Sequence, residues 1–469
     1  MTLTPEPEGQ RSPSDTSGQE ADPRNAGLFS RFARLCEEID STQRKVEKSR
    51  LISDYLSELH SSELVIATRC LSGYIFPLRE QRTLNVSSLI ILNCFAACAG
   101  VPTSFVREQY AKHEDIGNLA FELFSGGLPI VIAETLTISN VMSVLSELSS
   151  ISGTKRKGEH VIRLLRKASP LEAKYLVRLM HGDLQIGVLE SDVEDAISQW
   201  RNVSIGRIQS ANLLTGDIGE TALLCCQNKI DDARMRLYSP TNFMHAAEMS
   251  IRDDIARIFP DRFVVEDKFD GIRAQVHVGL DFPGKDITMG SAHDGLRVVI
   301  FSDELDDITE RFTDLVPSLS GLLSDQAGTV DAVGVILDGV IVPTRNGEVR
   351  PFAELQKRLN SAEPRDASRD TTVGFVSFDL LFSEGRSLIQ EDWYTRAEML
   401  NKTTFDAVAT FRARSHFVTT NKEIETILEM ALLRGSQGVV VKNPRSTYKP
   451  ARKGSDWIKI FGPSEFKSD

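Results

Sequence analysis

The sequence predicts a multidomain chain in which an all-α domain precedes an α+β domain. The first observation is the length of 469 residues, which is too long for one ordinary hydrophobic core. The second is that apolar residues recur every three or four positions up to about residue 228. The third is a change near Val264 to short β-branched runs alternating with amphipathic stretches, which leaves residues 229–259 as a connector.

Composition and charge are those of a globular protein without a uniformly basic surface. Hydrophobic residues make up 41% and charged residues 26% of the chain, and the formal net charge is −12. This balance excludes a surface that binds nucleic acid all over, although a local basic face remains compatible with it. No apolar run is long enough to span a bilayer.

The N-terminus and the cysteines together indicate a cytoplasmic protein. Residues 1–27 are rich in proline, serine and acidic residues, so we expect a disordered tail and no signal peptide. The cysteines form no CxxC pair and mostly lie in apolar helical stretches, which favours reduced thiols over zinc ligands or disulfides. They are Cys36, Cys70, Cys94, Cys98, Cys225 and Cys226.

Helical spacing dominates the first half of the chain. One helix start is marked by Ser169, a residue type that caps helices, followed by Pro170, which fits the first turn. The clearest helical stretches are residues 28–39, 50–59, 87–99 and 171–180.

In the second half, residues 264–268 and 272–278 read as two strands with a tight turn at Asp270-Gly271. Four further strands are expected at residues 297–302, 333–342, 374–382 and 438–442. Amphipathic helices are expected between them at residues 304–311, 352–359, 393–401 and 422–434.

The stretch Glu266 to Arg273 is a candidate site for phosphate chemistry. Alternate residues of a strand share a face, so Glu266 and Lys268 point the same way, and a turn at Gly271 would return Arg273 to Lys268. An ordinary lysine has a pKa of about 10.4 and is a poor nucleophile at neutral pH. Neighbouring cations and partial burial would lower that pKa and free the lone pair. The alternative is a surface hairpin with a common salt bridge.

A second cluster lies far downstream. An apolar strand ends in Lys442, and a basic stretch running from Ser446 leads to Lys459. Single lysines projecting from such strands can direct point charges at the phosphates of a nucleotide. The alternative is a hydrophobic strand with solvated lysine ends.

Together these segments resemble the ATP-dependent DNA ligase family of covalent nucleotidyltransferases. Lys268-Phe269-Asp270-Gly271 matches the K-x-D-G motif of the nucleophile in that family. The resemblance extends over residues 28–462. The other matching segments are residues 337–339, 352–359 and 377–381 in the second half, and 32–59, 172–178 and 182–188 in the first.

The resemblance implies a helical DNA-binding domain over residues 28–228. It also implies an adenylation (nucleotidyltransferase) domain, ATP-grasp-like and with antiparallel sheets, over residues 260–469. An oligonucleotide-binding (OB-fold) domain, usual in such ligases, is expected to be absent. The implied reaction uses ATP and Mg²⁺, and the implied partner is nicked double-stranded DNA bound by a monomer, in repair, recombination or replication.

The resemblance also assigns roles to residues. Lys268 would attack the α-phosphorus of ATP and carry AMP. Glu266 would contact the adenine, Phe378 would stack on it, and Arg273 would hold ribose or phosphate oxygens. Lys442 and Lys459 would stabilise charge that develops at the α-phosphate.

For DNA, the best basic cluster would contact the phosphate backbone without reading bases. The alternative is a solvated helix face. The cluster consists of Lys155, Arg156, Lys157, Arg163 and Lys167.

Five positions depart from the family pattern, one of them in the helical region, where Gln185 stands where arginine is typical. The other four lie in the second half. Asp303 stands where arginine is usual, Val340 and Gln437 stand where glutamates are usual, and Phe461 stands where a second lysine is usual. Gln437 would be a weak metal ligand, because a neutral amide oxygen binds a hard cation less well than a carboxylate. We therefore expect slow adenylation.

Two other functions remain open. One is a catalytically degenerate relative that only binds DNA or nucleotide, which the four departures favour. The other is an RNA ligase or capping enzyme, which shares the K-x-D-G motif but lacks the long helical region.

Overall fold

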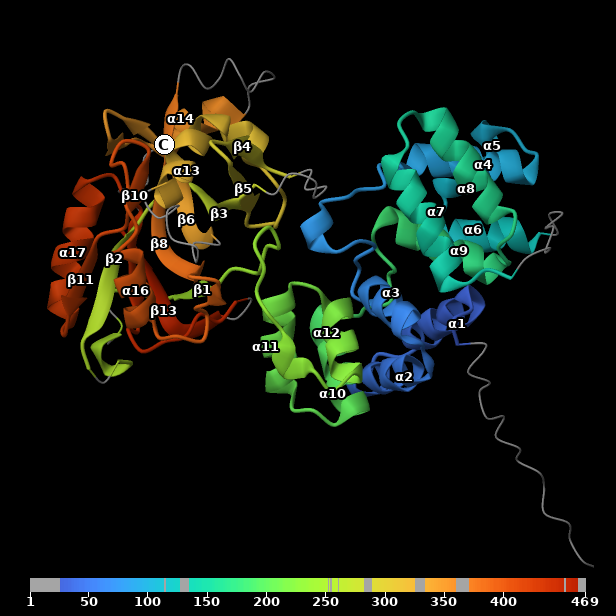
Figure 1. Cartoon of the computed structure of the whole chain (residues 1–469). Helices are drawn as coiled ribbons and strands as arrows, with labels where there is room; N and C mark the ends of the chain where they lie inside the picture. Colours follow the sequence, from blue (N-terminus) through green and yellow to red (C-terminus); the bar gives the residue numbers. More distant parts are fainter. Residues whose placement is uncertain are drawn as a thin grey trace, which may run out of the picture.

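The computed structural model describes residues 26–462 except 114, 127–134, 252, 254, 260, 282–288, 325–333, 360–370 and 451–452. The expected disordered tail lies outside the described residues, apart from Ala26 and Gly27. The described chain forms a helical part followed by a part with two β-sheets (Figure 1). This order confirms the predicted fold class.

The helical part begins at Phe29 and ends at Asp232. The helices expected from periodicity are all present. In chain order the elements are α1 (Phe29–Asp40), α2 (Lys45–Glu58), α3 (Ser61–Leu71), η2 (Leu78–Glu80), α4 (Ser88–Ala99), α5 (Thr103–Tyr110), α6 (Ile116–Ser125), α7 (Ile138–Ser150), α8 (Thr154–Leu165), α9 (Pro170–His181), α10 (Glu190–Arg201), α11 (Ile205–Thr215), α12 (Ile218–Cys226) and η3 (Ile230–Asp232).

Helix α9 starts where its capping residues predict. The Ser169 hydroxyl accepts a hydrogen bond from the Glu172 backbone N–H, and the Glu172 carboxylate accepts one from the Ser169 N–H. Pro170 is the first helical residue, where its missing N–H costs no hydrogen bond. The local signal therefore fixes the start of one of the central helices of this part.

The six cysteines of the chain are free thiols.

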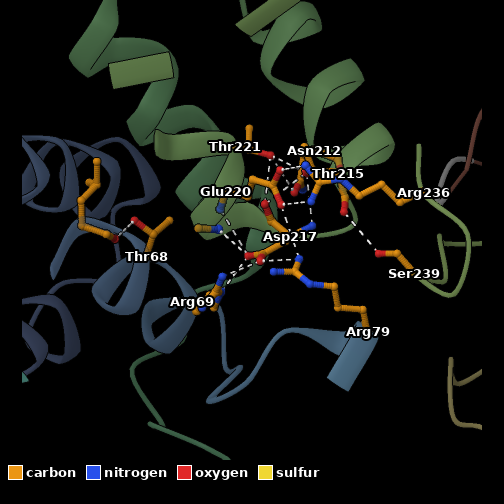
Figure 2. Close-up of polar contacts among 12 residues, drawn as sticks. Thr68, Arg69, Arg79, Asn212, Thr215, Asp217, Glu220, Thr221, Arg236 and Ser239 are labelled. Atoms are coloured by element: carbon orange, nitrogen blue, oxygen red, sulfur yellow. Dashed lines mark hydrogen bonds and ion pairs between the residues drawn. The ribbon is translucent and has the colours of Figure 1, made fainter. Parts of the chain in front are cut away.

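A buried carboxylate joins three segments of the helical part. Asp217 caps α12 and receives two hydrogen bonds from Arg69 of α3, at 2.8 and 2.6 Å, and one from Arg79 of η2 at 3.2 Å. Glu220, one turn further along α12, binds Arg236 of the connector (Figure 2). Burial alone would raise the pKa of Asp217, but hydrogen bonds and charge from Arg69, aided by Arg79, outweigh burial and lower it.

Asp217→Ala is expected to lower the free energy of unfolding by about 3 kcal/mol, because it leaves two arginines without their shared buried anion. Because its pKa is lowered in the folded state, Asp217 contributes fully to the free energy of unfolding above about pH 4. This contribution is lost as the pH falls below that value. Chemical denaturation at pH 7 and pH 3 measures both effects. A difference between wild type and variant that is the same at both pH values would contradict this account.

The second part contains two sheets and the helices that cover them. The first sheet has five strands in the order β1-β13-β12-β2-β11, and the second has eight, with β10-β8-β6-β3-β5-β4 as its main path. The strands are β1 (His245–Glu248), β2 (Phe263–Lys268), β3 (Ile272–Leu280), β4 (Ser291–His293), β5 (Leu296–Ser302), β6 (Gly334–Arg345), β7 (Glu348–Val349), β8 (Thr372–Ser383), β9 (Arg386–Ser387), β10 (Thr410–Arg412), β11 (Ser415–Val418), β12 (Gly438–Lys442) and β13 (Lys453–Phe461). The helices are η4 (Ile255–Arg257), η5 (Thr309–Leu315), α13 (Val316–Ser324), α14 (Phe352–Leu359), α16 (Trp393–Leu400) and α17 (Asn421–Leu433).

Most strand pairings are antiparallel, but β1 pairs with β13 and β10 pairs with β8 in parallel. Strand β1 comes from the stretch expected to be a connector. The part of that stretch before β1 is bound to the eight-stranded sheet, where buried His277 accepts a hydrogen bond from the Tyr238 N–H and Gln275 exchanges two with Thr241. Burial lowers the pKa of His277 to about 3, so the ring stays neutral.

The predicted turn at Asp270-Gly271 is a crossing between sheets, so the simple hairpin interpretation was wrong. Strand β2 pairs with β11 and β12, whereas β3 pairs with β5 and β6. Gly271 has no positive φ; a Cβ there would collide with the Ile341 carbonyl of β6. A close backbone approach therefore explains this glycine.

The helix expected at residues 304–311 was also wrong. Leu305 adopts a left-handed φ of 69°, and backbone bonds tie this loop back to β5, from Ile308 N to Ile300 O and from Ser302 N to Asp306 O. The Gln81 side chain, from the helical part, donates to Leu305 O and accepts from Asp307 N at 2.8 Å. Apolar periodicity carries no information about such a loop.

Within the described residues, no helix is both long and apolar enough to cross a membrane.

Candidate active site

One face of the five-stranded sheet carries the predicted nucleophile. Antiparallel neighbours that lie directly opposite each other point to the same face. Lys268 of β2 lies opposite Gly438 of β12, which lies opposite Phe461 of β13. The next row on this face is Glu266, Val440 and Lys459. The other face is mostly apolar and packs on α17, with Asp267 as an exception that binds Arg434.

At the nucleophile end, the Lys268 amine has one close hydrogen-bond acceptor. It donates to the Gln437 Oε1 at 2.6 Å and lies 4.8 Å from the centre of the Phe461 ring. The Lys459 amine lies 5.2 Å from the same ring and 3.2 Å from the Glu248 carboxylate. The Lys268 and Lys459 amines therefore both lie against the Phe461 ring.

The electrostatic surroundings favour a free amine at Lys268. Partial burial lowers the pKa of Lys268 first, and Lys459 and Arg273 lower it further. Asp270 and Glu248 act in the opposite direction without cancelling the shift. A lower pKa leaves more of the amine unprotonated at neutral pH, as nucleophilic attack requires.

At the other end of this face, Glu266 is 3% exposed and both of its carboxylate oxygens are bound. Ser415 of β11 donates to Oε1 at 2.7 Å, and the Lys442 amine lies 2.6 Å from Oε2. Burial raises the pKa of Glu266, and Lys442 and Ser415 oppose the shift. The carboxylate is thus held in one orientation by two donors.

Lys442 lies at the Glu266 end of this face. Its amine donates to the Phe378 carbonyl at 3.2 Å and lies 4.9 Å from the Phe378 ring and 4.3 Å from that of Trp457. The side chain is nearly fully buried, paired with Glu266. Lys442 is therefore the counter-charge of a buried carboxylate, and its expected contact with a phosphate stays a prediction.

The eight-stranded sheet contributes Arg273 from its β3 strand. The Arg273 guanidinium makes two hydrogen bonds to Asp338, at 2.7 and 2.6 Å, and lies 4.5 Å from the Phe378 ring. Tyr448 donates to the same carboxylate at 2.7 Å, and the Met244 carbonyl accepts from Arg273. Asp338 is fully buried, so these donors satisfy it and fix the arginine against the aromatic ring.

A cavity of about 250 Å³ opens beside Glu266 and Phe378. Its outer wall consists of aromatic and polar side chains from α16 and β11. A planar heterocycle of the size of a purine fits a space with these dimensions, apolar walls and two carboxylates, those of Glu266 and Glu398. The lining includes Trp393, Tyr394, Arg412, Ser415 and Phe417.

The described residues around Lys268 do not form a cluster of protein metal ligands. In the part of the chain that the structure describes, no three His, Cys, Asp or Glu side chains are grouped as ligands. The oxygen of Gln437, the expected weak ligand, is bound to the Lys268 amine. Mg²⁺ in nucleotide-dependent enzymes is usually held by one or two carboxylates together with substrate phosphates, so its use by this protein stays a prediction.

The expected DNA-binding cluster is only partly exposed. Lys155, Arg156 and Arg163 are exposed on α8, and Lys167 follows the helix half-buried. Lys157 is buried and donates to the backbone carbonyls of Leu84 and Asn85, so it cannot belong to a surface patch. The loop before α4 needs this donor because its carbonyls are away from water.

Three residues that organise the site were not identified from the sequence. Ser415 lies on a strand that the pattern did not reveal. Asp338 and Tyr448 were seen only as members of longer motifs, and their contact joins positions 110 residues apart. Nothing in the local spacing indicates that contact, although the acidic residue inside the apolar run of β6 is a usable signal.

Comparisons with known proteins agree with this arrangement. Residues 28–198 match the family model described as DNA ligase N terminus, and residues 243–460 match the one described as ATP dependent DNA ligase domain. A "Probable DNA ligase" of Koribacter versatilis is 32% identical over 453 residues, which cover 92% of this chain and 74% of the relative. A "DNA ligase" of Methanothrix thermoacetophila is 30% identical over 92% of this chain and 75% of the relative.

Among solved structures, the one described as Pmar-Lig_PreS3 is similar in fold, with a TM-score of 0.50 at 13% identity over 92% of this chain and 78% of that chain. The first family model covers the helical part as far as residue 198, and the second covers the two sheets up to residue 460. The chain therefore belongs to the ATP-dependent DNA ligase family.

Proposed function

We propose that the protein seals nicks in double-stranded DNA, joining a 5′-phosphate to a 3′-hydroxyl through an AMP group carried on Lys268. The observation that carries the proposal is the partly buried Lys268 amine, which has a neutral partner in Gln437 and lies close enough to Lys459 and Arg273 for their charges to lower its pKa. ATP is the co-substrate.

The first step forms one bond and breaks one. The Lys268 lone pair attacks the α-phosphorus, the bond to the pyrophosphate oxygen breaks, and the amine loses a proton to give a phosphoramidate. Lys459 is suited to stabilise negative charge at the phosphate, because its amine contacts the same ring as the nucleophile. A 5′-phosphate oxygen then takes AMP from the lysine, and the 3′-hydroxyl displaces AMP.

The base is proposed to occupy the cavity beside Glu266 and Phe378. The Glu266 carboxylate accepts hydrogen bonds, which suits the amino group of adenine, and the Phe378 ring offers an apolar face for stacking. Lys442 then orients Glu266, since its amine is already 2.6 Å from that carboxylate. Arg273 remains the candidate contact for ribose or phosphate oxygens.

The helical part is proposed to hold duplex DNA by its phosphate backbone. Arg156 and Arg163 are seven residues apart on α8, so they project from one exposed side of the helix. Lys155 and Lys167 extend this basic region. Contacts to phosphates of this type position a protein on DNA without reading its sequence.

The proposal is tested with a nicked duplex and ATP labelled in its α-phosphate. We expect a joined strand that requires ATP, with AMP and pyrophosphate as products. The competing function, a relative that binds DNA without joining it, is favoured by the neutral groups at Gln437 and Phe461. Bound DNA with neither labelled protein nor joined strand would establish that function, and joining of nicked RNA alone would indicate an RNA ligase.

A further inference from the structure

We propose that Phe461 is a positioning residue for the adenylation step. Its ring restrains the amines of Lys268 and Lys459 together and thereby directs the nucleophile. This inference rests on the proposed function, because it assumes that Lys268 is the attacking group. It assigns a role to a neutral aromatic residue at the end of β13.

Phe461 lies in the same cross-strand row as Lys268. Lys268 and Phe461 are both opposite Gly438, on either side of the central strand β12, so their side chains leave the sheet on the same face. Gly438 has no side chain between them, and a Cβ there would collide with the Ile460 carbonyl. The ring can therefore reach across the central strand to the lysine.

Two lysine amines lie close to the Phe461 ring. The Lys268 and Lys459 amines lie 4.8 and 5.2 Å from its centre, within the range of a favourable cation–π contact. Lys459 and Phe461 are two residues apart on one strand and so point the same way. Each lysine also has one polar partner, Gln437 for Lys268 and Glu248 for Lys459.

Lysine has a long and flexible side chain, so its amine needs contacts that restrain it. A lysine side chain loses much rotamer freedom when it is held in one geometry, and one hydrogen bond to exposed Gln437 restrains it weakly. A ring contact restrains the amine without adding a carboxylate that would bind it as a tight ion pair. Phe461 therefore limits where the protonated amine can go, and because the ring attracts the charged form most strongly, the contact weakens when the proton leaves and the amine attacks.

The test compares Phe461→Leu with Phe461→Tyr in the full chain. The leucine variant keeps apolar bulk but removes the ring, so we expect the rate of AMP labelling at saturating ATP to fall about tenfold, with little change in KM for ATP. The tyrosine variant keeps the ring and should stay close to wild type. Phe105→Leu, an exposed aromatic of α5, is the matched control.

A second readout does not depend on ATP chemistry. Lys268 is modified with an amine-reactive acylating reagent and quantified by peptide mapping. We expect modification to be several times faster in Phe461→Leu than in wild type or Phe461→Tyr. Equal rates in all three proteins would overturn the inference, as would a leucine variant that labels with AMP as fast as wild type. Absence of AMP labelling in wild type would instead contradict the proposed function, and the acylation rates would still decide the role of Phe461.

Discussion

Lys268→Ala is expected to abolish AMP labelling of the protein and all strand joining. The reason is chemical, because alanine offers no lone pair with which to form the phosphoramidate. The fold should be kept, since the amine is partly exposed and its close hydrogen-bond acceptor is the exposed Gln437 side chain. Labelling with α-labelled ATP followed by denaturation measures the loss, and thermal unfolding checks the fold.

Lys402→Ala provides the matched control, as this lysine is exposed and lies just beyond α16. It should label like wild type. Lys459→Ala should label slowly but measurably, because it removes a stabilising charge and leaves the nucleophile in place. Label of wild-type strength in Lys268→Ala would mean that another residue carries AMP.

Asp338→Asn is expected to lower both stability and adenylation. Asp338 is fully buried and accepts two hydrogen bonds from Arg273 and one from Tyr448. Asparagine places an N–H group against these donors and leaves Arg273 without a counter-charge, which costs about 3 kcal/mol in the free energy of unfolding. Release of Arg273 from the Phe378 ring should slow AMP labelling roughly a hundredfold.

A double variant separates the two effects. Asp338→Asn combined with Arg273→Met removes the unpaired charge as well as its partner, so part of the lost stability should return. Labelling should remain slow, because the arginine is still missing. Denaturant titration and the labelling rate are measured on the same preparations. An unchanged free energy of unfolding in Asp338→Asn would show that this carboxylate does not anchor the site.

The parts of the fold that were predictable are those set by local chemistry. Ser169 and Pro170 mark a helix start that the structure has, and the apolar run before Lys442 is a strand of the expected length. The pairing of strands was not predictable in the same way. Asp270-Gly271 indicates a turn, but nothing in those residues reveals that β2 and β3 join different sheets.

The candidate site shows the same division. Glu266 and Lys268 are two residues apart in a strand, so the sequence alone predicts that their side chains share one face of the sheet. Ser415 binds Glu266 across 149 residues of chain, and no spacing rule gives that contact. The burial of Lys442 and Lys157 depends on which carboxylate or carbonyl each one meets. Residue type alone assigned Lys157 to an exposed patch to which it does not belong, and it did not reveal the pairing of Lys442 with Glu266.

Mass spectrometry of the protein after reaction with ATP tests the central claim most directly. The protein is incubated with ATP, digested under conditions that preserve phosphoramidates, and its peptides are fragmented to locate the added AMP. We expect a single modified residue, at position 268, and loss of the adduct when pyrophosphate or nicked DNA is added. AMP on any other residue, or no adduct in a protein that joins nicks, would contradict the account.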